Sequence, residues 1–307
     1  MSILKLDYPV YSLDRQLLLR AGTTLTDETL KTLISSRGAD HRKTHALMQY
    51  GTVKEDVLNY LTHPPANIIF KDQRRISEIM KIMEHVKLVL PVLDSIEYFK
   101  THDAYTYRHI LVVFALSALL SRNLISDDHV RIRESAAGPS HDIGKICVPV
   151  KILKKASPLT RDERKRLEHH TTAGCILLSY YLQDIDHLTV RVARDHHERI
   201  NGSGYPRGIN LNDRAVEIVA VCDIYDALSA SRPYRPLSYD NRSALEEITL
   251  MAQRGEVSWE VVQALVAKNR KRKLHFSDCS VSLEKRGAPP PGNMYGMIAD
   301  NESNSPL

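Results

Sequence analysis

Apolar residues recur at spacings of three and four from about Ile76 to Leu90, namely Ile76, Ile79, Met80, Ile82, Met83, Val86, Leu88 and Leu90, and predict one helix over this stretch. This spacing places apolar side chains on one face of an α-helix, whereas a half-buried strand would need strict alternation. Alternating patterns and βαβ units are absent from this part of the sequence, so a helical bundle is expected rather than a layered α/β domain. Besides the helix near Ile76, helices are expected over residues 109–121, 160–182, 189–197, 214–230, 242–253 and 258–269, the second starting at a Thr160–Glu163 capping box.

The first 70 residues follow a different pattern. Residues 17–20, the turn Ala21-Gly22 and Thr26 ahead of a short apolar stripe predict a strand, a turn and a capped helix. The pair Pro64-Pro65 interrupts helical patterning and predicts a linker. We therefore expect a mainly α protein, with a small α+β N-terminal domain over residues 1–70, a helical domain over residues 71–274, and a polar, proline-rich, flexible tail over residues 275–307.

Composition excludes several classes of protein. The longest apolar run, Ile110 to Leu120, spans 11 residues, whereas a membrane-spanning helix needs roughly 18 or more. The N-terminal residues lack an export signal, and the four cysteines are too scattered for a disulfide framework or a thiolate zinc site. We expect a cytoplasmic protein that does not associate with membranes. The net charge of +5 permits an anionic ligand without indicating nucleic acid.

Histidines are concentrated in one part of the chain, because nine of the fourteen lie between residues 102 and 197. His141 is followed by Asp142, and on a helix such neighbours can converge on one metal while the second carboxylate oxygen reaches another. His109 lies upstream in an apolar helix, and Asp223 lies in the apolar stretch 218–227. An unpaired carboxylate is costly to bury, and a bound metal would offset that cost.

A second set of nitrogen ligands is available in His170, His196 and His197. The last two precede the glycine- and proline-rich segment 201–206, which predicts a sharp turn beside the imidazoles. A single histidine is more often a structural residue than a ligand. Taken together, these histidines and aspartates predict a metal site.

Five blocks of the sequence, in order, resemble the HD-GYP family of cyclic di-GMP phosphodiesterases, a branch of the metal-dependent HD phosphohydrolases. The blocks are residues 141–145, 149–160, His170 with Gly174, 196–206 and 223–235. The resemblance runs from about His109 to Pro236, and more loosely to Lys268. It implies a helical HD-type domain.

The resemblance also implies two metal ions. One would be bound by His109, His141, Asp142 and Asp223, and the other by His170, His196 and His197, with Asp142 bridging the two. Imidazoles with a bridging carboxylate favour iron, with manganese as the alternative. Tyr105 stands where family members with a third metal carry a carboxylate, so two ions are expected rather than three.

The family pattern further implies which residues meet the substrate. Lys145 corresponds to the lysine that contacts the scissile phosphate, and Arg232 and Arg235 correspond to a basic pair that holds phosphate. Tyr205 is the motif tyrosine, with packing of the turn as its alternative role to catalysis. Asp226 also matches a family block, which implies that it either contacts a metal ligand from behind or caps a helix. Pro139-Ser140 replaces the usual apolar pair before the His-Asp motif, which could shift the start of that helix.

The reaction implied is two-metal hydrolysis of cyclic di-GMP to the linear dinucleotide, and further to GMP, in bacterial second-messenger signalling. Three alternatives stay open: a hydrolase of another nucleotide, a metal-containing cyclic di-GMP receptor with little or no turnover, and a di-iron oxygenase. The basic cluster at residues 268–273 is interpreted as a solvated helix end. A protein partner could bind through the N-terminal domain.

Overall fold

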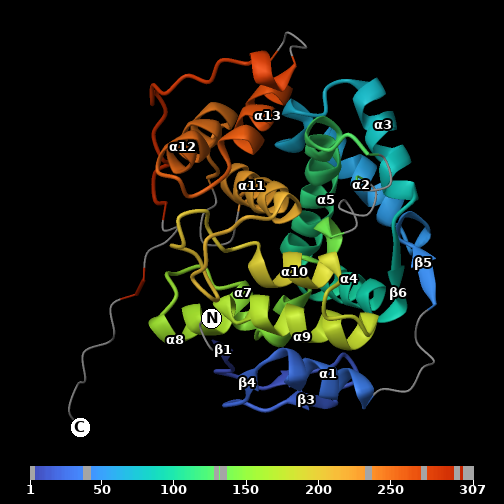
Figure 1. The fold of residues 1–307 in the computed structure, drawn as a ribbon. Helices are drawn as coiled ribbons and strands as arrows, with labels where there is room; N and C mark the ends of the chain where they lie inside the picture. The colour runs from blue at the N-terminus through green and yellow to red at the C-terminus, as the bar shows by residue number, and fades with distance from the viewer. Residues whose placement is uncertain are drawn as a thin grey trace.

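The computed structural model describes residues 4–36, 43–127, 131, 137–231, 237–270, 275–293 and 298–299. Helices dominate them (Figure 1), in agreement with the expected mainly α fold. The α-helices are α1 (Asp27–Ser35), α2 (Val53–Thr62), α3 (Gln73–Glu84), α4 (Leu90–His102), α5 (Ala104–Leu124), α7 (Val150–Leu153), α8 (Arg161–Glu168), α9 (His170–Leu182), α10 (Leu188–Asp195), α11 (Arg214–Ser229), α12 (Asn241–Gln253) and α13 (Trp259–Asn269). The 3-10 helices are η1 (Leu47–Gln49), η2 (Ala66–Ile68), η3 (Gly138–Ser140), η4 (Ile143–Cys147) and η5 (Phe276–Asp278).

Helix α5 forms the centre of the bundle. Every residue from His109 to Ser121 is buried, because α2, α3, α4, α11 and α13 all contact this helix. By length and composition α5 could cross a membrane, but 83% of its most apolar stretch is buried inside the protein. Its apolar surface is therefore covered by other helices, as expected for the core helix of a bundle.

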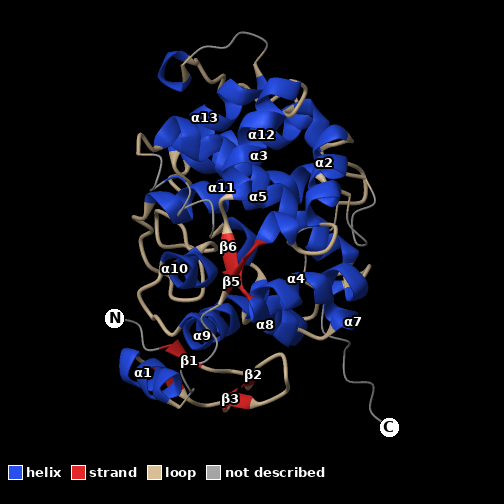
Figure 2. Ribbon diagram, turned by 90° about the vertical axis from the view of Figure 1, so that its right-hand side faces the viewer, coloured by secondary structure: helices blue, strands red, loops and turns tan. Residues whose placement is uncertain are grey.

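The N-terminal unit is small and mixed in structure (Figure 2). Strand β1 (Leu4–Lys5) pairs with β4 (Thr24–Leu25), and β2 (Val10–Tyr11) pairs with β3 (Leu17–Leu19), both antiparallel. The Thr26 side chain caps α1 by accepting a hydrogen bond from the Thr29 amide. The predicted strand, turn and capped helix are thus confirmed. Helix α1 packs on α9, and the Leu13 amide donates to the Tyr181 hydroxyl at 2.9 Å.

The periodic stretch that starts near Ile76 is not one helix, contrary to expectation. Helix α3 ends at Glu84, and residues 87–89 form strand β6 (Lys87–Val89), which pairs with β5 (Thr44–Ala46). Pro91 then lies in the first turn of α4. The pairing with a strand about forty residues away overrides the local helical pattern.

The expected domain boundaries stay a prediction, but two contacts bear on them. Residues 44–62 lie against the helical part, because β5 pairs with β6 and α2 contacts α5. The start of the predicted tail also packs on the helices, since Phe276 and Cys279 are buried. The amides of Arg286 and Gly287 both donate to the Glu246 carboxylate.

Two further expectations need correction. The helix predicted over residues 160–182 begins with the expected capping box but breaks at His169 into α8 and α9. Side chains take up the carbonyls at the break: His170 Nδ1 donates to the Leu167 oxygen, and Thr171 donates to the Glu168 oxygen. His141 and Asp142 were also expected on a helix, but they form a turn between η3 and η4. Pro139 lies in the first turn of η3.

Candidate metal centre

The structure brings together all seven residues that the sequence analysis assigned to metal binding. They come from five parts of the fold: His109 from α5, His141 and Asp142 from the turn between η3 and η4, His170 from the start of α9, His196 and His197 from the turn directly after α10, and Asp223 from α11. Each of these elements is held by its own packing, since α5 contacts α11 and η3, and α9 contacts α10 and η4. The cluster is therefore positioned by the bundle and not by a flexible loop.

Asp142 lies between two pairs of histidines. Its Oδ2 atom is 3.5 Å from His109 Nε2 and 3.4 Å from His141 Nε2. Its Oδ1 atom is 3.4 Å from His170 Nε2 and 3.8 Å from His196 Nε2. Each carboxylate oxygen thus faces a different pair of imidazoles, which is the arrangement that a bridging ligand requires.

Asp223 and His197 extend the cluster. Asp223 Oδ1 is 3.0 Å from His109 Nε2, and Asp223 Oδ2 is 3.8 Å from His197 Nδ1. Three groups of potential ligand atoms each lie within 4.8 Å of one another: His109, His141 and Asp223; His170, His196 and His197; and His141, Asp142 and His196. The first two are hereafter called the first centre and the second centre.

Hydrogen bonds on the far side of the rings orient four of the imidazoles. The Nδ1 atoms of three histidines lie within hydrogen-bond distance of backbone carbonyl oxygens: His141 at 2.7 Å from Gly138, His170 at 2.6 Å from Leu167, and His196 at 3.1 Å from Val192. His109 Nδ1 instead lies 2.7 Å from Asp226 Oδ2. Because these partners only accept, each Nδ1 carries the proton, and each Nε2 is left to face the cluster.

Within the part of the chain that the structure describes, several atoms at the centre of the cluster have no hydrogen-bond partner. His109 Nε2, His141 Nε2 and Asp142 Oδ1 are all buried without one. A buried polar atom without a partner costs about 1–3 kcal/mol, and three of them converge here. Metal ions would satisfy all three, so the residues present fit the group of ions that the sequence predicts.

A family model for the HD domain matches residues 72–257. The chain belongs to the HD domain family. The match spans every residue of the cluster, from His109 on α5 to Asp223 on α11.

Curated relatives match about half of this chain. A cyclic di-GMP phosphodiesterase of Pseudomonas aeruginosa is 38% identical over 177 residues, which cover 57% of this chain and 42% of the relative. A cyclic di-GMP phosphodiesterase of Thermotoga maritima is 37% identical, with 52% and 42% covered. A 3'3'-cGAMP-specific phosphodiesterase of Vibrio cholerae is 31% identical, with 56% and 38% covered. The chain thus spans less than half the length of each of these relatives.

The protonation states of His170, His196 and Asp142 suit metal ligands. Burial lowers the pKa of His170 to about 4 and that of His196 to about 3. Burial alone would raise the pKa of Asp142, but the Lys145 ammonium and the neighbouring histidines hold it well below its usual value. Neutral imidazoles beside an ionised carboxylate are the forms that coordinate metal.

Two of the predicted substrate residues border the cluster. Lys145 Nζ lies 2.5 Å from Asp142 Oδ2. The Tyr205 ring stacks on His197, with centroids 4.6 Å apart and an interplanar angle of 21°. The other two, Arg232 and Arg235, lie outside the described residues.

The turn that carries Tyr205 is anchored by a residue that the sequence analysis did not single out. Glu198 is fully buried, and its carboxylate accepts hydrogen bonds from the amides of Arg207 at 2.7 Å and Ile209 at 3.1 Å. A Cβ on Gly204 would lie 2.3 Å from the His197 carbonyl oxygen, so only glycine fits there. A charged residue directly after two adjacent histidines was the available signal for Glu198.

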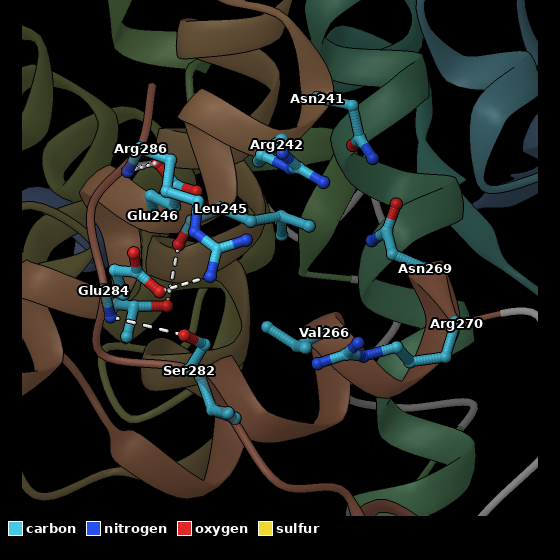
Figure 3. A pocket seen from close by; sticks show the side chains of 12 residues that line it. Asn241, Arg242, Leu245, Glu246, Val266, Asn269, Arg270, Ser282, Glu284 and Arg286 are labelled. Carbon is cyan, nitrogen blue, oxygen red and sulfur yellow. Dashed lines mark hydrogen bonds and ion pairs between the residues drawn. The ribbon is translucent and has the colours of Figure 1, made fainter. Parts of the chain in front are cut away.

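A separate cavity of about 400 Å³ lies between α12, α13 and residues 281–286 (Figure 3). Its lining mixes Arg242, Arg270 and Arg286 with Glu246 and Glu284. None of the predicted site residues that the structure describes contributes to this lining. The cavity is therefore distinct from the histidine cluster.

Proposed function

We propose that this HD domain is a two-metal phosphodiesterase that hydrolyses cyclic di-GMP to the linear dinucleotide, and further to GMP, in bacterial second-messenger signalling. The observation that carries the proposal is the convergence of four Nε2 atoms on the two oxygens of Asp142, with three of the cluster's atoms left without a hydrogen-bond partner. The names of the relatives from Pseudomonas aeruginosa and Thermotoga maritima support the choice of substrate.

His109, His141 and Asp223 would hold one ion, His170, His196 and His197 the other, and Asp142 would be shared. When bound, the ions would supply Lewis acidity for attack of water on the phosphodiester. Iron is favoured and manganese is the alternative, because imidazoles with a bridging carboxylate suit both better than magnesium.

The chain's own residues would then act on the phosphate. The Lys145 ammonium, next to Asp142, would offset negative charge that develops on the phosphoryl oxygens. Arg232 and Arg235 would bind the phosphates through their guanidinium groups. Tyr205, stacked on His197, would orient the substrate beside the second centre. We place this activity in the cytoplasm, with the N-terminal unit as the surface for a protein partner.

The experiment described in the next paragraph also tests two other functions. A receptor would bind cyclic di-GMP with both ions present but without turnover. The 3'3'-cGAMP-specific relative from Vibrio cholerae raises the mixed cyclic dinucleotide as an alternative substrate.

The test is metal analysis of anaerobically purified protein, followed by turnover assays with cyclic di-GMP and 3'3'-cGAMP. Two equivalents of metal and faster hydrolysis of cyclic di-GMP are expected. Binding of cyclic di-GMP without product would instead identify a receptor, and faster hydrolysis of 3'3'-cGAMP would change the substrate. Protein that takes up no metal would refute the proposal.

A further inference from the structure

His109 differs from the other oriented histidines in the partner behind its ring. His141, His170 and His196 donate to backbone carbonyl oxygens, whereas His109 donates to the carboxylate of Asp226. A carboxylate attracts the Nδ1 proton more strongly than a carbonyl does, so the opposite nitrogen becomes a stronger donor to a metal.

The carboxylate behind His109 is itself held by a cation. Arg108 Nη1 lies 3.0 Å from Asp226 Oδ1 and 3.1 Å from Asp226 Oδ2. The Asp226 side chain is only 2% exposed and that of Arg108 is 17% exposed. The guanidinium compensates a charge that would otherwise be costly to bury.

The positions of these residues couple the pair to the first centre. Arg108 directly precedes His109 on α5, and Asp226 follows Asp223 by three residues, about one turn, on α11. The Arg108–Asp226 ion pair thus joins the two helices beside the contact between His109 and Asp223. A shift of either residue would move one metal ligand relative to another.

We infer that Arg108 and Asp226 are positioning residues that fix the orientation of His109 and make the first centre the tighter of the two metal sites. The inference rests on the proposed function, because it requires the cluster to bind metal. At the second centre, the partners described for His170 Nδ1 and His196 Nδ1 are carbonyl oxygens. The two centres are therefore chemically unequal although each contains three of the ligands.

The experiment titrates the metal-depleted protein with Co²⁺ against a competing chelator, and assigns each binding step by anomalous scattering from crystals at partial loading. Wild-type protein is expected to fill the first centre before the second. Asp226→Asn is expected to weaken the first centre by about 10- to 100-fold and to leave the second unchanged. Arg108→Met should produce a smaller loss at the same centre, and Arg108→Lys, which keeps the charge, should restore part of it.

Asp103→Asn is the matched control. Asp103 is also a buried carboxylate attached to α5, but it accepts hydrogen bonds from Thr106 at the start of the helix and does not contact His109. If a general loosening of α5 explained the effect, this variant would lose Co²⁺ from the first centre as well, and the inference would be wrong.

The outcomes separate the inference from the proposed function. Wild-type protein that binds no Co²⁺ would overturn both. The inference alone would be overturned if wild-type protein binds two ions and the Asp226→Asn variant either binds both as tightly as wild type does or loses both to the same extent. The visible absorption of Co²⁺ gives a second readout, because loss of the His109 donor changes the ligand field at one centre only.

Discussion

Gly144 lies against His170 so closely that a Cβ on residue 144 would come within 1.8 Å of the His170 carbonyl oxygen. The missing side chain lets η4 approach the start of α9, and this approach sets the separation between Asp142 and His170. The close contact between η4 and α9 thus helps to place Asp142 next to His170.

Gly144→Ala is therefore expected to push η4 away from α9. We expect the free energy of unfolding to fall by about 3 kcal/mol or more, and we expect metal binding to be lost as well. Gly174→Ala is the control within the same contact, because its Cβ would lie 3.3 Å from Ala193 Cβ; we expect a change of no more than about 1 kcal/mol there. Urea unfolding measures both, and equal stability of the two variants would contradict the explanation.

Asp142→Asn keeps the shape of the side chain but removes the charge that both centres share. Metal and hydrolysis should be lost together, since an amide is a poor bridge between two cations. Tyr105→Phe should change neither. Metal content and turnover of the two variants check this, and three sites in an anomalous map or a fully active Asp142→Asn protein would refute the two-ion assignment.

Glu198→Gln should affect the turn next to the metal cluster without affecting metal content. A glutamine side chain accepts through one oxygen only, so one of the amides of Arg207 and Ile209 would lose its partner, at a cost of about 1–3 kcal/mol. We expect the turn carrying Tyr205 to loosen and KM for the cyclic dinucleotide to rise by about fivefold or more, since 1 kcal/mol corresponds to roughly a fivefold change. Glu284→Gln, at a side chain that is 60% exposed, should behave like wild type.

Replacing Arg232 and Arg235 together by alanine should weaken nucleotide binding and leave both ions in place. A guanidinium does not ligate metal, and its role in the proposal is to meet phosphate charge. Calorimetry with cyclic di-GMP gives the affinity, and metal analysis provides the control. An unchanged affinity would remove both arginines from the substrate site.

His169 predicts a pH dependence of stability. Burial lowers its pKa to about 4, compared with roughly 6.5 in the unfolded chain. Between these two values the unfolded state binds more protons, so this histidine reduces stability as the pH falls from about 6.5 to 4. His169→Gln should remove up to about 3 kcal/mol of that pH-dependent loss. Urea unfolding at pH 7 and pH 4, with chelator present, measures it, and an identical pH slope in the variant would exclude the histidine as a cause.

The convergence of the cluster's histidines and aspartates was predictable from sequence because the chemistry that suggests it resides in residue types and short blocks. A histidine or an aspartate in apolar surroundings, such as His109 or Asp223, costs free energy to bury unless a partner compensates it, and a metal ion is one such partner. The order and type of most helices followed from the apolar spacing, which α11 and α12 match to within one residue.

The features that the sequence did not reveal depend on contacts between distant segments. Strand β6 exists because β5 pairs with it. The family pattern already implied that Asp226 lies behind the ligands or caps a helix, but its contact with His109 depends on the packing of α5 against α11. No local pattern encodes these contacts.

His109 and Asp226 touch although they are 117 positions apart in the chain. Bringing such distant segments together requires loop closure, and its entropic cost must be met before any ion can find its ligands. The first centre is consequently incomplete until α5 and α11 have both been synthesised and packed together. A nascent chain that ended before α11 could already contain α5, α9 and α10, yet it would offer no complete first centre, so capture of an ion there would report that synthesis had passed Asp223.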